Sequence, residues 1–148
     1  AIAHERDERI KRLAGKIDRV LVDAPCSGLG TLRRNPDLKW RQSPEALAEL
    51  AQKQTAILAS AARLVKPGGR LIYATCSVLP QENEAIAEAF SAAHDGFAVE
   101  DAGELLTQLK VASATDLCSG GETGSRYLRL WPHTHQTDGF FAAVWTRK

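Results

Sequence analysis

The stretch IDRVLVDAPCSGLG, residues 17–30, decides which fold the chain can adopt. Its first part is rich in isoleucine, valine and leucine and ends at Pro25, which is typical of a short strand buried in a parallel sheet. Cys26 follows the proline directly and begins a turn of small residues. The pattern therefore predicts a thiol at the carboxyl end of a buried strand.

A long helix is predicted over residues 43–65, SPEALAELAQKQTAILASAARLV, where leucine and isoleucine recur near helical spacing. Ser43 is a favourable N-cap, and Pro44 suits the first helical position. The KPGG that follows predicts the end of this helix, with Gly68 as a left-handed C-cap. Residues 70–77, RLIYATCS, are then a second candidate for a buried strand.

The order of these elements predicts parallel α/β packing. A second helix over residues 79–93, entered through Pro80, completes a strand, helix, strand, helix series. In such a sheet, ligands bind at the carboxyl ends of the strands. Because Cys26 and Cys76 each follow a predicted strand, we expect both thiols at one crevice.

The last third of the chain departs from this alternation. Residues 97–109 predict a short helix at best. Two apolar segments, 127–131 and 139–146, flank a polar turn and predict an antiparallel hairpin at the end of the sheet. The expected fold class is therefore α/β, with part of a mostly parallel sheet and a terminal antiparallel hairpin.

The composition, 44% hydrophobic and 25% charged over 148 residues, is that of one soluble globular domain. A formal net charge of +1 neither favours nor excludes a polyanionic partner. The sequence shows no long apolar run and no charged-then-apolar leader, so we expect a cytoplasmic protein without a membrane partner. Three cysteines without CxxC spacing disfavour both a secreted disulfide framework and a zinc site, and no metal is expected.

Two cysteines in one crevice are compatible with several chemistries. A cysteine hydrolase needs a histidine base in the same site, but none of the four histidines has a motif context. His133 and His135 alternate along a predicted strand edge and could form a metal pair, although a solvated or structural use is favoured. A redox pair of cysteines would normally be spaced as CxxC, which is absent.

Covalent attack on a pyrimidine ring is the third alternative. Carbon 5 of cytosine becomes a nucleophile only after a thiolate adds to carbon 6, so one thiol must attack. After methyl transfer a base must remove the carbon-5 proton so that the thiolate can leave, and a second thiol or a carboxylate could assist. An acid at Asp23, beside the ring or the methyl donor, completes the set. Chemistry alone leaves Cys26 and Cys76 as equal candidates for the nucleophile.

Three longer stretches resemble one known family. Residues 23–40, DAPCSGLGTLRRNPDLKW, and 66–84, KPGGRLIYATCSVLPQENE, look like motifs IV and VI of the Sun/RsmB-type RNA cytosine-carbon-5 methyltransferases. Residues 138–145, DGFFAAVW, resemble the closing strand motif of that family. The two long blocks together, in this order, are highly specific, whereas either tetrapeptide alone would be weak.

The resemblance implies a Rossmann-like methyltransferase domain that uses S-adenosylmethionine. It assigns Cys76 of the TCS motif as the nucleophile that adds to the ring, and Cys26 of the PCS motif as the residue that assists release of the methylated RNA. Asp23 would lie at the junction of cofactor and target base. Ribosomal RNA is the favoured substrate, with transfer RNA as the main competitor.

A basic stretch follows the first cysteine. In RRNPDLKWR, residues 33–41, the side chains of Arg33, Arg34 and Lys39 suit contacts to RNA phosphates. Trp40 either stacks on RNA or packs on the core, and core packing is slightly favoured. The acidic residues of segment 82–84 fall in the first turn of the second helix, where a structural use is favoured.

The glycine-rich cofactor loop of the family is missing from the sequence. We therefore expect residues 1–148 to be the C-terminal portion of one methyltransferase domain, without its cofactor-binding half. Such a fragment should bind S-adenosylmethionine weakly, turn over little, and self-associate through an exposed sheet edge. Two further hypotheses stay open: a non-catalytic RNA-binding or assembly module, and a redox-sensitive protein in which Cys26 and Cys76 form a disulfide.

Overall fold

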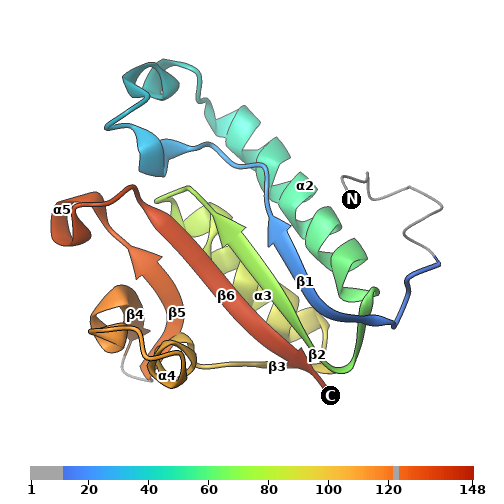
Figure 1. Cartoon of the computed structure of the whole chain (residues 1–148). Helices are drawn as coiled ribbons and strands as arrows, with labels where there is room; N and C mark the ends of the chain where they lie inside the picture. Colours follow the sequence, from blue (N-terminus) through green and yellow to red (C-terminus); the bar gives the residue numbers. More distant parts are fainter. Residues whose placement is uncertain (1–11, 122–123) are drawn as a thin grey trace.

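The computed structural model describes residues 12–121 and 124–148, which form a six-stranded mixed sheet with helices packed against it (Figure 1). The strands follow the order β1, β2, β6, β5, β4 across the sheet, and β3 pairs with β6. The α/β fold class is confirmed. The strands are β1 (Ile17–Asp23), β2 (Val65–Thr75), β3 (Phe97–Val99), β4 (Cys118–Gly121), β5 (Gly124–Leu130) and β6 (Phe140–Arg147), and the α-helices are α2 (Pro44–Ala62), α3 (Glu84–Ala93), α4 (Ala102–Gln108) and α5 (Pro132–His135).

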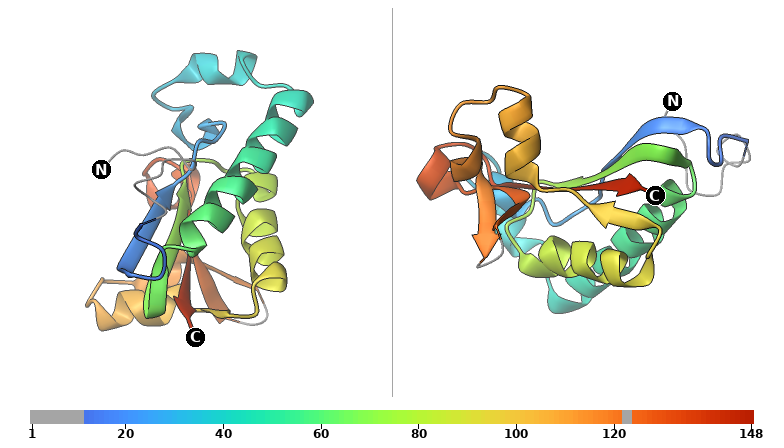
Figure 2. Two further views of the ribbon diagram at one scale, coloured as in Figure 1. Left: turned by 90° about the vertical axis from the view of Figure 1, so that its right-hand side faces the viewer. Right: turned by 90° about the horizontal axis from the view of Figure 1, so that it is seen from below.

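The first strand, α2 and the second strand form the predicted parallel unit. β1 and β2 run in the same direction, with Asp23 opposite Ala74 at their carboxyl ends. The long α2 connects them and lies with α3 on the same face of the sheet (Figure 2). Its N-cap is Ser43 as predicted, because the Ser43 hydroxyl accepts a hydrogen bond of 3.2 Å from the Ala46 amide.

The end of α2 differs from the prediction. The helix ends at Ala62, with Arg63 as its C-cap, and Gly68 lies inside β2 instead. The reason is tertiary: Val65 is fully buried and already pairs with Ile17, so the chain enters the sheet before it reaches the glycine. Gly68 does adopt a left-handed φ of 74°, where the pairing of the two strands is irregular.

The second predicted helix is present but divided. A short 3₁₀ helix, η3 (Pro80–Glu82), precedes α3, and Asn83 between them has φ −115° and ψ −94°. The Asn83 side chain is buried, accepts a hydrogen bond from Thr75 Oγ1 and donates one of 3.0 Å to the Ser77 carbonyl. Asn83 therefore holds the loop after β2, and the regular helix begins only at Glu84.

The C-terminal hairpin forms as predicted, but β6 lies inside the sheet. β5 and β6 pair antiparallel, with Leu128 opposite Ala142. β6 also pairs antiparallel with β2, with Tyr73 opposite Ala143, so it separates the parallel unit from the rest of the hairpin. Within the described residues only β1 and β2 are parallel neighbours.

The core lies between the central strands and helices α2 and α3. Its largest fully buried side chains are those of Trp145, Tyr73, Phe141, Leu58 and Leu71. In contrast, β1 is an edge strand in the described part of the chain and most of its residues are exposed, although the sequence predicted a buried strand. Leu21 on β1 is 64% exposed. Self-association through this edge stays a prediction.

None of the described helices combines the length and apolar character needed to cross a membrane.

Candidate active site

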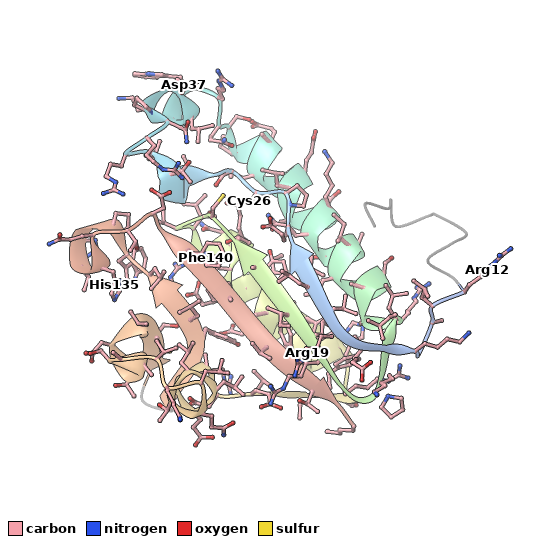
Figure 3. All side chains as sticks on the ribbon, viewed as in Figure 1. Arg12, Arg19, Cys26, Asp37, His135 and Phe140 are labelled. Atoms are coloured by element: carbon pink, nitrogen blue, oxygen red, sulfur yellow. The ribbon has the colours of Figure 1, made fainter. Side chains whose placement is uncertain are left out.

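The two motif cysteines meet at the carboxyl edge of the parallel pair. The backbone pairing continues one residue past β1, where the Ala24 amide donates to the Ala74 carbonyl at 2.9 Å. Cys26 and Cys76 follow at the same level, and their Sγ atoms lie 3.5 Å apart. Both cysteines are free and half-buried. Figure 3 shows Cys26 at this edge, beyond the tip of β1.

Burial keeps the Cys26 thiol protonated. Loss of hydration, the largest cause, and the neighbouring Cys76 together raise the pKa of Cys26 to about 12, against a backbone hydrogen bond from Gly28 that lowers it. Cys26 is therefore a neutral thiol at pH 7, and its S–H can donate to the Cys76 sulfur. The surroundings of Cys26 therefore oppose its thiolate form.

A buried carboxylate lies directly beneath the two cysteine loops. Glu82 is fully buried and accepts hydrogen bonds from the Ser27 amide at 2.8 Å and from the hydroxyls of Ser27 and Ser77 at 2.5 Å. Gln54, from α2, donates to the same carboxylate at 3.0 Å. The sequence analysis favoured a structural use of segment 82–84, but it did not connect Glu82 with the serines that follow each cysteine.

Three backbone segments meet beside Cys76. The Gly30 amide donates to the Cys76 carbonyl at 2.9 Å, and the Gly139 amide donates to the Gly30 carbonyl at 2.8 Å. Both glycines are buried. A Cβ atom on Gly30 would lie 2.6 Å from the Cys76 carbonyl oxygen and 2.3 Å from that of Gly139, so this approach needs glycine. The turn after Cys26 and the loop before β6 are thereby fixed to the TCS loop.

A buried arginine from the hairpin supports the same loop. Arg129 is 3% exposed and donates to the Val78 carbonyl at 3.0 Å, two residues after Cys76. Its Nε lies 3.4 Å from Glu84, and its guanidinium stacks 4.3 Å from the Trp131 ring. Sequence reasoning did not identify Arg129, because β5 carries no motif and its place beside the loop is set by strand pairing.

Asp23 is the last residue of β1 and is exposed. Across residues 12–121 and 124–148, no hydrogen-bond donor or ion-pair partner reaches its carboxylate. A free acid at the carboxyl end of a parallel strand fits the polar groups of a cofactor bound there. A glycine-rich cofactor loop is not among the described residues.

The predicted RNA-binding residues lie on exposed turns after Cys26. Arg34 forms an ion pair with Asp138, with its Nε 2.9 Å from Oδ2, and Arg33 Nη2 lies 3.7 Å from Oδ1 of the same carboxylate. The Arg34 guanidinium lowers the pKa of Asp138, which is therefore ionised at neutral pH. Lys39 lies 4.7 Å above the Trp40 ring, and Trp40 is 80% exposed, so the expectation that it packs on the core is wrong.

The remaining candidates have structural roles away from the cysteines. His133 and His135 lie on α5 and not on a strand edge. His135 accepts a hydrogen bond from the Trp131 amide and its other ring nitrogen lies 2.9 Å from the Asp116 carbonyl. The described part of the chain contains no cluster of three or more metal-ligating side chains. Cys118 donates to the Ala114 carbonyl at 3.3 Å.

A parallel strand, helix, strand unit with two thiols at its carboxyl edge is consistent with a partial Rossmann-like methyltransferase fold. The family model described as 16S rRNA methyltransferase RsmB/F matches residues 2–146. The chain therefore belongs to the RsmB/F family of methyltransferases, which depend on S-adenosylmethionine.

Individual relatives agree with this assignment. The chain is 46% identical over 127 residues to the "Probable ribosomal RNA small subunit methyltransferase B" of Synechocystis. This match covers 86% of the chain and 26% of the relative. It is 41% identical over 128 residues to the "Ribosomal RNA small subunit methyltransferase B" of Shewanella oneidensis, and this match covers 86% of the chain and 26% of the relative. The chain thus spans about a quarter of the length of these relatives.

A solved structure gives the same result for the fold. NSun6 from Pyrococcus horikoshii, solved with the S-adenosylmethionine analogue SFG, superimposes with a TM-score of 0.73 at 26% identity. The match covers 99% of this chain and 34% of that protein.

Proposed function

We propose that the chain carries the catalytic thiols of an RNA 5-methylcytosine methyltransferase that acts on ribosomal RNA. The observation that carries the proposal is the 3.5 Å contact between Cys26 and Cys76 at the carboxyl edge of β1 and β2. Two thiols at one site match a reaction in which one sulfur adds to the ring and a second group assists its later departure. The family assignment supports RNA methylation, and the RsmB/F type favours ribosomal RNA.

In this proposal Cys76 is the nucleophile. Its thiolate forms a bond to carbon 6 of cytosine, and the electron pair of the ring double bond makes carbon 5 nucleophilic. S-adenosylmethionine supplies the methyl group that carbon 5 takes up. A base then removes the carbon-5 proton, the double bond re-forms, and the bond between sulfur and carbon 6 breaks. Cys26, neutral and in contact with Cys76, assists this last step.

We further propose that Asp23 contacts the cofactor beside the target base. The cofactor site would be completed by a glycine-rich loop outside residues 1–148, so that this chain alone binds S-adenosylmethionine weakly and turns over little. Calorimetric titration of the chain with the cofactor tests this part separately, and tight binding would contradict it.

The product identifies the reaction. A complete methyltransferase that contains this chain, incubated with labelled S-adenosylmethionine and small-subunit ribosomal RNA, is expected to yield 5-methylcytidine as the labelled nucleoside after digestion. The measurement is mass spectrometry of the nucleosides, with transfer RNA as the parallel substrate. Label in transfer RNA alone would change the proposed substrate from ribosomal RNA to transfer RNA. Label in another nucleoside would contradict the cytosine chemistry, and tight RNA binding without any label would favour the binding module.

The exposed side chains of Arg33 and Lys39 are each expected to contribute to RNA affinity. Arg33→Ala and Lys39→Ala should each weaken RNA binding about fivefold at 0.1 M salt and lower the salt slope by about 0.7, the value for one lost phosphate contact on a single strand. Filter binding across a salt series measures both quantities. Lys53→Ala is the matched control, because Lys53 is an exposed lysine on α2 that pairs with Glu49. Equal salt slopes for all three variants would mean that RNA does not contact Arg33 or Lys39.

A further inference from the structure

We propose that Glu82 is a positioning residue that holds the two cysteine loops together, so that Cys26 and Cys76 act on the same base. This inference rests on the proposed function for its catalytic meaning. Its structural content, the thiol contact, can be tested without cofactor or RNA.

The two cysteine loops are arranged side by side as matching dipeptides. Cys26 and Cys76 are in contact at 3.5 Å, and the residues that follow them, Ser27 and Ser77, have their hydroxyl oxygens 3.2 Å apart. Both hydroxyls donate to one oxygen of the Glu82 carboxylate, Oε2, at 2.5 Å. One carboxylate oxygen therefore bridges the loop after β1 and the loop after β2.

The other carboxylate oxygen is bound as well. Glu82 Oε1 accepts from the Ser27 amide at 2.8 Å and from Gln54 Nε2 at 3.0 Å. Gln54 also donates to the Pro25 carbonyl at 3.0 Å, which attaches α2 to the loop that carries Cys26. Four donors thus surround the two oxygens of one carboxylate.

Only neutral groups hold the Glu82 carboxylate. Within residues 12–121 and 124–148, no lysine, arginine or histidine pairs with Glu82, and the side chain is fully buried. A buried carboxylate group held only by neutral donors depends on all of them, because each lost bond leaves a buried oxygen without a partner. Moving either loop away from the other would break these bonds, so Glu82 resists separation of the two thiols.

Glu82→Gln is the decisive substitution. The amide is nearly isosteric with the carboxylate, but its NH₂ group would face donors and cannot accept from them. One of the two loops must then lose its attachment. We expect the contact between the Cys26 and Cys76 sulfurs to loosen, while the sheet and helices are retained.

The experiment measures thiol proximity in the chain itself, in a Cys118→Ser background that leaves only Cys26 and Cys76. Dibromobimane alkylates both thiols: each thiolate displaces one bromide, a sulfur–carbon bond replaces a carbon–bromine bond, and the proton passes to buffer. Fluorescence appears when both arms have reacted. The rate of cross-linking is divided by the rate of single alkylation with monobromobimane, which corrects for changes in the reactivity of each thiol.

The expected result is a ratio at least tenfold lower in Glu82→Gln than in the parent. Glu88→Gln makes the same chemical change on an exposed position of α3 and should leave the ratio unchanged. Phe90→Leu weakens the buried core at the Trp145 contact and should also leave it unchanged, which separates positioning from general destabilisation. A ratio within twofold of the parent in folded Glu82→Gln, or an equal loss in Phe90→Leu, would overturn the proposal.

Milder variants decide the question if Glu82→Gln does not fold. Ser27→Ala and Ser77→Ala each remove one hydroxyl from the carboxylate and should lower the ratio at least threefold. Unchanged ratios in both would overturn the proposal. Because the readout needs no methyl transfer, a failure of the proposed function leaves these ratios unaffected, so the two failures are distinguishable.

Discussion

Cys76→Ala is expected to abolish the covalent complex between the methyltransferase and RNA that contains 5-fluorocytosine. The substituted base is attacked at carbon 6 and methylated, but fluorine at carbon 5 cannot leave as a proton does, so the enzyme remains attached. Without the attacking sulfur no bond to carbon 6 forms. Methyl transfer to normal RNA should fall by about 10³-fold or more, the range seen when a covalent nucleophile is removed.

Cys26→Ala is expected to behave in the opposite way. The pKa of Cys26 is raised to about 12, mainly by burial, so its thiol is protonated below that pH and gains its charge only above it. At pH 7 the Cys26 sulfur is therefore almost entirely in its thiol form. Such a sulfur is a poor nucleophile but a useful neutral partner for Cys76. The adduct should therefore persist in Cys26→Ala, and release of methylated RNA should slow.

The measurement is a denaturing gel of labelled RNA, run with a complete methyltransferase that contains this chain. Cys118→Ala is the matched control, because Cys118 bonds the Ala114 carbonyl outside the cysteine site and should trap RNA like the parent. If the adduct instead requires Cys26 and survives Cys76→Ala, the chemistry holds and the two roles are exchanged. If no variant and no parent forms an adduct, the covalent mechanism is wrong.

The sequence predicted those features that depend on local signals or on the geometry of parallel strands. Ser43 and Pro44 mark the start of α2 because capping needs only neighbouring residues. The contact of Cys26 with Cys76 followed from the βαβ arrangement, since the carboxyl ends of neighbouring parallel strands lie at one edge. The 3.5 Å separation itself comes from the structure.

The features that the sequence did not predict depend on contacts between distant segments. Gly68 looked like a helix C-cap, but burial of Val65 in the sheet ends α2 earlier. The position of β6 between β2 and β5 is decided by strand pairing that no local pattern encodes. The sequence indicated only an acidic residue in the first turn of a helix at Glu82, because its partner Ser27 is 55 residues away in sequence. A serine directly after each motif cysteine was the one available signal.

Gly30→Ala is expected to produce the largest loss of stability among single-methyl changes at the site. The added Cβ would lie 2.3 Å from the Gly139 carbonyl oxygen and 2.6 Å from the Cys76 carbonyl oxygen. Both atoms belong to the backbone, so no side-chain rotation can relieve the overlap. Relief requires moving the loop before β6 or the TCS loop, at the expense of the Gly30 hydrogen bonds to Cys76 and Gly139.

Overpacking of this kind costs about 3 kcal/mol or more of unfolding free energy, which corresponds to a melting temperature lower by about 6 to 12 °C. Thermal unfolding followed by circular dichroism measures the shift. Gly96→Ala is the matched control, because a Cβ there meets no atom within 4 Å, and its melting temperature should stay near that of the parent. If Gly30→Ala has the same melting temperature as Gly96→Ala, the backbone contact of Gly30 with Cys76 and Gly139 must relax at little cost. The TCS loop would then be held by Glu82 and Arg129 more than by its backbone neighbours.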